Sequence, residues 1–162
     1  MKTLVVYFSL EGNTEYVAEK IREKTGADLL KLVPKKPYRD KGLAKFLWVG
    51  KSAVMGEKPE LEAYEIDLSG YERIVFGFPV WASNFTPPLR TFIVDNREKL
   101  KGKTFFAFAC QSGAGAEKAL KKLSVCLEIE SFERTAVFID PKAKHTDDKE
   151  AQIDAFCAAL QG

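Results

Sequence analysis

The chain has few cysteines, a single histidine and almost no net charge, and each shortage excludes a class of protein. Its three cysteines in 162 residues are odd in number and widely spaced, without a C-x-x-C pair, so they predict neither a disulfide framework nor a zinc or dithiol site. Such sparse use of cysteine fits a reducing, cytoplasmic location. A chain of this length buries enough surface to fold without disulfides, and we expect one domain, residues 1–162.

Long apolar runs are also missing. No stretch approaches the roughly 20 residues that cross a bilayer, and Met1-Lys2 leads into a strand-like run rather than into the apolar core of a signal peptide. We therefore expect no membrane insertion and no secretion. The 25 basic and 23 acidic side chains leave a formal charge of +2, which is too small to predict nucleic-acid binding. Eight basic and two acidic residues lie between residues 31 and 58, a segment that we interpret as a solvated face, with a docking surface as the alternative.

Several catalytic signatures are absent as well. A low-molecular-weight phosphatase has an arginine six positions after its cysteine, whereas Ala116 stands six positions after Cys110. The turn around Gly12 lacks the Gly-Lys-Ser/Thr of a Walker loop, and no G-x-S-x-G elbow occurs in the chain. The one histidine, His145, lies in a polar turn and is interpreted as a surface residue rather than a base. Acids and histidine do not cluster at ligand spacings, so we predict no metal site and assign no catalytic residue.

The chain does contain a series of short, continuously apolar runs. Continuous hydrophobicity indicates strands that are covered on both faces, as in a parallel sheet. Amphipathic segments with apolar residues at i, i+3, i+4 and i+7 alternate with these runs, which predicts an α/β fold. The five runs are Leu4 to Phe8, Leu29 to Val33, Ile74 to Phe78, Phe105 to Cys110 and Ala136 to Ile139, and the clearest helical stripes are Ala116, Ala119, Leu120 and Leu123, and Ile153, Phe156, Cys157 and Leu160.

Helix start and stop signals agree with this division. Gly26 is suited to end the first helix, and Asp147 with Glu150 resembles a capping box that opens the last one. The sequence Thr86-Pro87-Pro88 is suited to start another helix, because proline is tolerated in the first turn. The segment 34–67 is the least regular, and its apolar residues between 46 and 55 predict an excursion with a helix of its own.

In a doubly wound parallel sheet, ligands bind outside the carboxyl ends of the strands, so the loops that follow the strands are candidate sites. The first loop, Ser9 to Thr14, joins a strand to a helix and would direct unpaired backbone N–H groups at an anion such as a phosphate. The alternative is an ordinary turn in which Asn13 or Thr14 caps the helix.

The second loop offers an aromatic surface, and the third loop offers backbone that a ligand can approach closely. In Pro79 to Phe85, Trp81 stands at a strand exit where a planar ring could stack on it, whereas Phe85 is interpreted as a core residue. In Gln111 to Gly115, small residues let a ligand approach the backbone closely.

Together these loops resemble those of the flavodoxin family, and the resemblance spans nearly the whole chain. Phe8-Ser9-x-x-Gly12-Asn13-Thr14 resembles the family's phosphate loop, and Pro79-x-Trp81 followed by Pro88-x-x-x-Phe92 is similar to a short-chain branch. The resemblance implies a doubly wound five-stranded parallel sheet of order 2-1-3-4-5, with helices on both faces, that binds FMN. The cofactor-binding residues that it implies are Ser9, Glu11, Gly12, Asn13, Thr14, Pro79, Val80, Trp81, Ala82, Ser83, Asn84, Cys110, Gln111, Ser112, Gly113 and Gly115.

By the same resemblance, the FMN phosphate would lie at Ser9 to Thr14 and the ring between the Trp81 and Cys110 loops. Two departures from the family pattern stand out. Glu11 stands where the family usually has a small hydroxyl residue, so we expect its carboxylate to point outward when FMN binds. Ala82-Ser83 replaces an aromatic-plus-glycine pair and stiffens a peptide whose mobility, in flavodoxins, helps to stabilise the one-electron reduced flavin.

The resemblance implies an electron-transfer flavoprotein that passes single electrons between redox partner proteins. The alternative is an oxidoreductase that takes hydride from NADH or NADPH and reduces a quinone-type acceptor. A flavodoxin-fold module without cofactor is a further alternative, supported by Glu11 alone. The pI of 8.3 differs from the acidic character typical of carriers, yet the small size leaves little room for a nicotinamide site, so we expect the carrier. The oligomeric state stays open.

Overall fold

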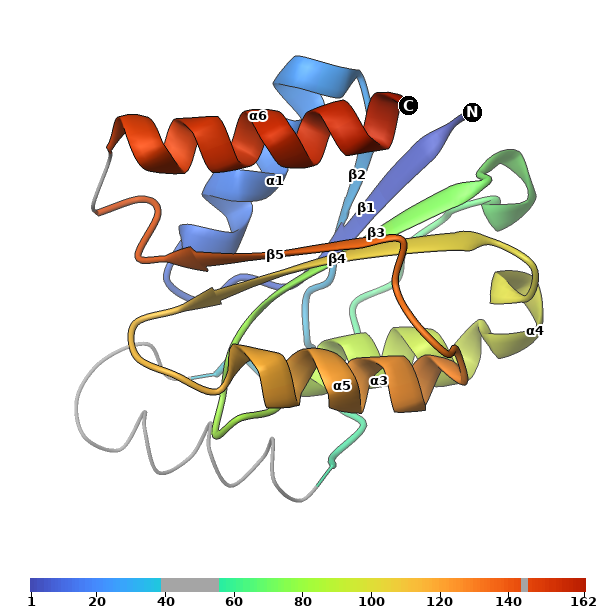
Figure 1. Ribbon diagram of the computed structural model, residues 1–162. Coiled ribbons are helices and arrows are strands. Elements are labelled where there is room, and N and C mark those ends of the chain that lie inside the picture. The colour runs from blue at the N-terminus through green and yellow to red at the C-terminus, as the bar shows by residue number, and fades with distance from the viewer. Residues whose placement is uncertain (39–55, 144–145) are drawn as a thin grey trace.

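The computed structural model describes residues 1–38, 56–143 and 146–162, and its centre is a twisted parallel sheet (Figure 1). The five strands follow the order β2-β1-β3-β4-β5, and every neighbouring pair is parallel. This confirms the predicted α/β class, the number of strands and the doubly wound order. The strands are β1 (Thr3–Tyr7), β2 (Asp28–Lys31), β3 (Arg73–Pro79), β4 (Thr104–Gln111) and β5 (Arg134–Ile139).

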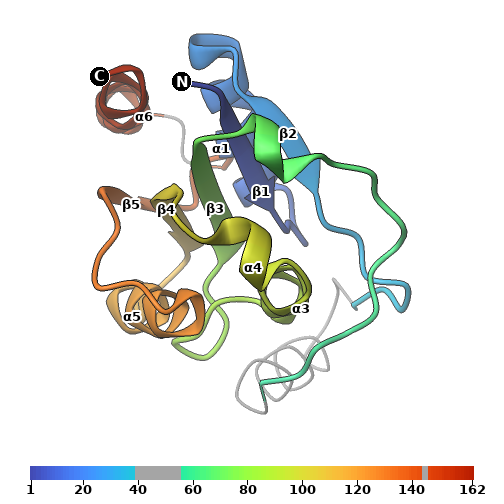
Figure 2. The same cartoon turned by 90° about the vertical axis from the view of Figure 1, so that its right-hand side faces the viewer.

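Helices cover both faces of the sheet. Figure 1 shows α1 and α6 on one face and α3 and α5 on the other, and Figure 2 shows the same layers from the side. The predicted excursion helix between residues 46 and 55 lies outside the described residues. The helices are α1 (Asn13–Thr25), the 3₁₀ turn η1 (Leu68–Gly70), α3 (Pro87–Asp95), α4 (Arg97–Leu100), α5 (Ala116–Leu127) and α6 (Asp147–Gln161).

The central strands β1, β3 and β4 are buried on both faces of the sheet, whereas the edge strands β2 and β5 are more exposed. Successive side chains of a strand point to opposite sides of the sheet. In β1, Leu4 and Val6 pack in the cluster beneath α3 and α5, whereas Val5 and Tyr7 pack in the cluster beneath α1 and α6. All four side chains are 2% exposed or less. The continuously apolar runs therefore reflect two cores, one on each face of the sheet.

The helix ends match the sequence signals in two cases out of three. Gly26 ends α1 in a left-handed conformation and donates its N–H to the Arg22 carbonyl, as predicted. Pro87 opens α3, also as predicted. The prediction of a capping box at Asp147 is wrong, because Thr146 is the N-cap of α6 and Asp147 already lies inside its first turn. The acidic residues in the first turn still stabilise α6, because they lie at the positive end of the helix dipole.

The three cysteines are free: Cys110 and Cys157 are buried and Cys126 is partly exposed. Over the parts of the chain that the structure describes, no helix combines the length and the apolar character needed to cross a membrane.

Candidate functional site

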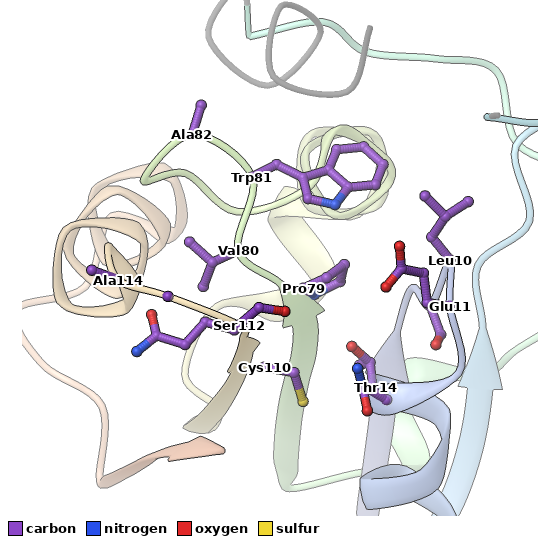
Figure 3. Close-up of a pocket in the computed structure, with 14 residues that line it drawn as sticks. Leu10, Glu11, Thr14, Pro79, Val80, Trp81, Ala82, Cys110, Ser112 and Ala114 are labelled. Atoms are coloured by element: carbon purple, nitrogen blue, oxygen red, sulfur yellow. The ribbon is translucent and has the colours of Figure 1, made fainter. Parts of the chain in front are cut away.

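A cavity of about 430 Å³ lies at the carboxyl edge of the sheet, where the loops after β1, β3 and β4 meet (Figure 3). This volume falls within the range of small-molecule sites. The structure thus brings the three predicted loops together around one space. The residues that line it are Ser9, Leu10, Glu11, Asn13, Thr14, Pro79, Val80, Trp81, Ala82, Cys110, Gln111, Ser112, Gly113 and Ala114.

Most of the predicted site residues lie in this lining. Four of them, Gly12, Ser83, Asn84 and Gly115, do not, although each belongs to one of the three loops. Sequence reasoning missed two lining residues, Leu10 and Ala114, which lie inside predicted loops but carry no polar or aromatic signal.

The first loop forms an open N-terminus of α1. Gly12 is the N-cap, with φ of 100° and no side-chain cap, so the alternative in which Asn13 or Thr14 caps the helix is wrong. Ser9 Oγ accepts a hydrogen bond from the Glu15 N–H at 3.2 Å. The N–H groups of Asn13 and Thr14 have no acceptor among the described residues. This is the arrangement that binds anions at helix ends.

Thr14 gives an independent indication of a ligand. Its side chain is 1% exposed and lines the cavity, yet its Oγ1 has no hydrogen-bond partner within the described parts of the chain. A buried hydroxyl without a partner costs about 1–3 kcal/mol. An anion held by the neighbouring N–H groups would supply the missing partner, so the residues of this turn fit a phosphate.

Asn13 serves this turn in a way that the sequence did not indicate. Its side-chain Oδ1 accepts a hydrogen bond from the backbone N–H of Lys142, at 3.0 Å, in the loop that follows β5. The two residues are 129 positions apart, so no local pattern could have paired them. A fourth post-strand loop is therefore attached to the phosphate turn.

The second loop is a tight reverse turn with an uncommon backbone. Ala82 and Ser83 have φ of 49° and 58°, in the left-handed region that non-glycine residues seldom adopt. Trp81 and Asn84 exchange two backbone hydrogen bonds of 3.0 Å across them, as in the mirror-image turns of β-hairpins. Gly115 is needed beside this turn, because a Cβ there would lie 2.6 Å from Ser83 Oγ.

Trp81 is more buried than the sequence indicated. It is 7% exposed and packs edge to face against Phe8 and Tyr38, with ring centroids 5.5 and 5.0 Å away. Tyr38, from the segment after β2, covers one side of the indole. The indole still forms part of the cavity wall (Figure 3). Phe85, at 1% exposure, is a core residue as interpreted.

In the third loop, side-chain hydrogen bonds hold the backbone in place. Gln111 Oε1 accepts the Ala116 N–H at 3.0 Å at the start of α5, and Ser112 Oγ donates to Asp140 at 2.7 Å. The N–H groups of Ser112 and Gly113 have no acceptor in the described structure and border the cavity. They are available to a ligand with carbonyl or ring-nitrogen acceptors.

The charged and titratable groups of the lining are few. Burial raises the pKa of the Cys110 thiol to about 12, so it remains protonated at neutral pH and is no nucleophile. Glu11 is exposed and lies in the lining, with its carboxylate on the cavity side rather than turned outward (Figure 3). Among the residues placed by the structure, no group of three His, Cys, Asp or Glu could hold a metal ion.

Known proteins share this architecture. A family model described as Flavodoxin matches residues 2–144. A protein described as a flavoprotein from Bacteroides eggerthii is 24% identical, with a TM-score of 0.74 over 99% of this chain and 98% of that one. A flavoprotein from Lactobacillus acidophilus, solved in complex with FMN, is 22% identical, with a TM-score of 0.73 over 87% of this chain and 94% of that one. The two-electron reduced flavodoxin of Megasphaera elsdenii is 20% identical, with a TM-score of 0.60 over 97% and 96%.

A search of curated proteins finds no match. The family match nevertheless runs from the first strand to the loop after β5, and it includes the three loops that form the cavity. The structural neighbours have the same doubly wound sheet. The chain therefore belongs to the flavodoxin family.

Proposed function

We propose that the protein binds FMN in this cavity and acts in electron transfer. The observation that carries the proposal is the phosphate turn, where the buried Thr14 hydroxyl and the N–H groups of Asn13 and Thr14 converge without protein acceptors. A flavodoxin-family chain with such a turn has the donors that a phosphate monoester needs. The flavoprotein of Lactobacillus acidophilus, which has the same fold, was solved with FMN.

The other loops would then receive the flavin ring. The apolar wall of Val80 and Trp81 suits the faces of the ring, and the free N–H groups of Ser112 and Gly113 suit its polar edge. Bound FMN supplies chemistry with one or two electrons, while the protein supplies position and electrostatics. The residues of this chain hold the phosphate, exclude water from one side of the ring and donate hydrogen bonds at its edge.

At about 430 Å³ the cavity has room for a single ligand of the size of FMN. We favour the carrier because the described lining holds few groups suited to act on a second substrate. The ring edge would then meet redox partner proteins directly. No charged residue of the described lining other than Glu11 is in position to take part in proton transfer at neutral pH.

Thr14→Val tests the FMN site, because valine keeps the shape of threonine and removes the hydroxyl. We expect this variant to bind FMN about tenfold more weakly, from the loss of one hydrogen bond to a charged group. Riboflavin, which lacks the phosphate, should lose no affinity. Thr86→Val is the matched control, since Thr86 Oγ1 is also buried without a partner but lies outside the cavity.

Fluorescence quenching of each flavin measures these dissociation constants. If Thr14→Val lost as much affinity for riboflavin as for FMN, the Thr14 hydroxyl would not contact the phosphate. A wild-type protein that binds neither flavin would support the module without cofactor, for which Glu11 in the lining is the structural argument.

One observation favours the second candidate, an FMN-dependent NAD(P)H:quinone-type oxidoreductase. The turn at Ala82 and Ser83 is fixed by two backbone hydrogen bonds, so it has little freedom to reorganise between redox states. Anaerobic photoreduction, followed by absorbance and electron paramagnetic resonance, distinguishes the two. A high yield of one-electron reduced flavin with no oxidation of NADH or NADPH in the presence of a quinone supports the carrier. Direct passage to fully reduced flavin, with nicotinamide oxidation, supports the oxidoreductase.

A further inference from the structure

A lysine from outside the three loops lies against the phosphate turn. The Lys142 side chain passes directly over Gly12: its Nζ, Cδ and Cε lie 2.9, 3.4 and 3.7 Å from the point that a Cβ of Gly12 would occupy. A side chain at position 12 would push the end of Lys142 away from the turn. The absence of a side chain at position 12 therefore serves two purposes, since Gly12 also has a φ of 100° that favours glycine.

The loop that carries Lys142 is held in place on both sides. Asn13 Oδ1 accepts the Lys142 backbone N–H at 3.0 Å, and the Asp140 N–H donates to the Gln111 carbonyl at 3.1 Å. Pro141, between them, is buried. The base of the lysine side chain is thus fixed beside α1, and only its outer part is free to adjust.

The charges around the cavity show what such a lysine would do. Glu11 is the one charged side chain in the described lining, and its carboxylate would repel a phosphate on the same turn. No lysine or arginine lines the cavity in the described parts of the chain. The ammonium of Lys142 lies beside Gly12, at the junction between Glu11 and the first N–H groups of α1. It adds a positive charge beside the turn on which Glu11 adds a negative one.

We propose that Lys142 is a phosphate-binding residue of the flavin site, and that Asn13 acts as a positioning residue that holds it there. The proposal rests on the proposed binding of FMN. Its two further supports are independent of each other: the contact of Lys142 with Gly12, and the buried Thr14 hydroxyl without a partner on the same turn. The phosphate would be held by backbone and hydroxyl donors from inside the turn and by one ammonium from its rim.

The test compares FMN with riboflavin in three variants. Lys142→Met removes the charge and keeps the length of the side chain, Lys142→Arg keeps the charge, and Lys122→Met removes a lysine from the exposed side of α5, away from the lining. Dissociation constants are measured by quenching of flavin fluorescence at about 0.05 M and about 0.5 M salt, where screening is weak and strong.

For Lys142→Met we expect FMN to bind about fivefold more weakly at low salt, as for a partly exposed ion pair, with a smaller loss at high salt. Riboflavin should bind as it does to the wild-type protein. Lys142→Arg should restore most of the affinity, and Lys122→Met should change neither flavin. Asn13→Ala should weaken FMN less in the Lys142→Met background than in the wild-type protein, because the two residues act together.

The proposal is overturned if wild-type protein binds FMN and Lys142→Met binds it as tightly as Lys122→Met does, or if riboflavin loses as much affinity as FMN. Fully additive losses for Asn13→Ala and Lys142→Met overturn the positioning role of Asn13. A wild-type protein that binds no flavin overturns the proposed function itself, which is a different result.

Discussion

The left-handed turn at Ala82 and Ser83 makes a prediction about stability with a definite sign. Ala82 is exposed and has a φ of 49°, so its Cβ crowds the backbone and gains no packing in return. The left-handed conformation costs a non-glycine residue about 1–2 kcal/mol. Ala82→Gly removes this cost. It also destabilises the folded state by about 0.4–1 kcal/mol, because glycine has more conformational freedom to lose when the chain folds.

The balance leaves a gain of about 0.5–1 kcal/mol in the free energy of unfolding, or roughly 2 °C in Tm for a chain of this size. Urea denaturation of the protein without added flavin, followed by circular dichroism, measures it. The matched control is Ala155→Gly, the same change at an exposed position within α6. A glycine in a helix interior costs about 1 kcal/mol, so the two variants should differ in sign.

A loss of stability in Ala82→Gly as large as that in Ala155→Gly would show that the backbone at Ala82 is not strained. The same variant also tests whether the stiffness of this turn affects the reduction of the flavin. Glycine at position 82 frees the peptide between the two turn residues, so photoreduction of the FMN-loaded variant should yield more one-electron reduced flavin than the wild-type protein does. An unchanged yield would show that the rigidity of this turn does not control the redox chemistry.

Two further predictions follow from the titratable groups. Burial raises the pKa of all three thiols, to about 12 for Cys110 and about 11 for Cys157, so iodoacetamide at pH 8 should label the partly exposed Cys126 first and the other two only on unfolding. Peptide mass spectrometry checks the order, and early labelling of Cys110 would contradict its burial. The Tyr71 hydroxyl donates to Asp28 at 2.7 Å and lowers the pKa of that carboxyl, so this bond stabilises the fold above about pH 4 and loses its effect as the pH falls. Tyr71→Phe should therefore lose about 1 kcal/mol or less at pH 7 and approach the wild-type stability near pH 3 in urea denaturation, whereas an equal loss at both pH values would exclude the linkage.

The sheet was predictable because its central strands, β1, β3 and β4, are buried on both faces and therefore leave continuous apolar runs in the sequence. The runs were placed within a few residues of the strands, and the misfits lie at strand ends. The run from Leu29 to Val33 continues past β2, which ends at Lys31. Leu32 is still buried and donates its N–H to the Tyr7 carbonyl, whereas Val33 is 45% exposed. An apolar run marks the residues that are buried, and burial continues past the last residue that is paired in the sheet.

The site was predictable where it depends on local backbone, and not where it depends on distant partners. Strand, turn and helix are contiguous in Ser9 to Thr14, so the sequence indicates that turn directly. The burial of Trp81 depends on Tyr38, from a segment without periodic pattern, and the contact between Asn13 and Lys142 joins opposite ends of the chain. The cap of α6 depends on backbone angles at Thr146 rather than on residue type. Long-range packing decides the first two, and local backbone geometry the third.

The hydrogen bond between Asn13 and Lys142 also has a consequence for how the protein is assembled. It joins the first loop of the sheet to the last, so the rim of the phosphate turn is complete only after β5 has taken its place at the edge. Closing so long a stretch of chain costs conformational entropy, which the contacts at the rim must offset. A ligand that needs this rim binds only the finished fold and shifts the folding equilibrium by mass action. Flavin affinity would therefore report whether the carboxyl-terminal strand and helix have docked.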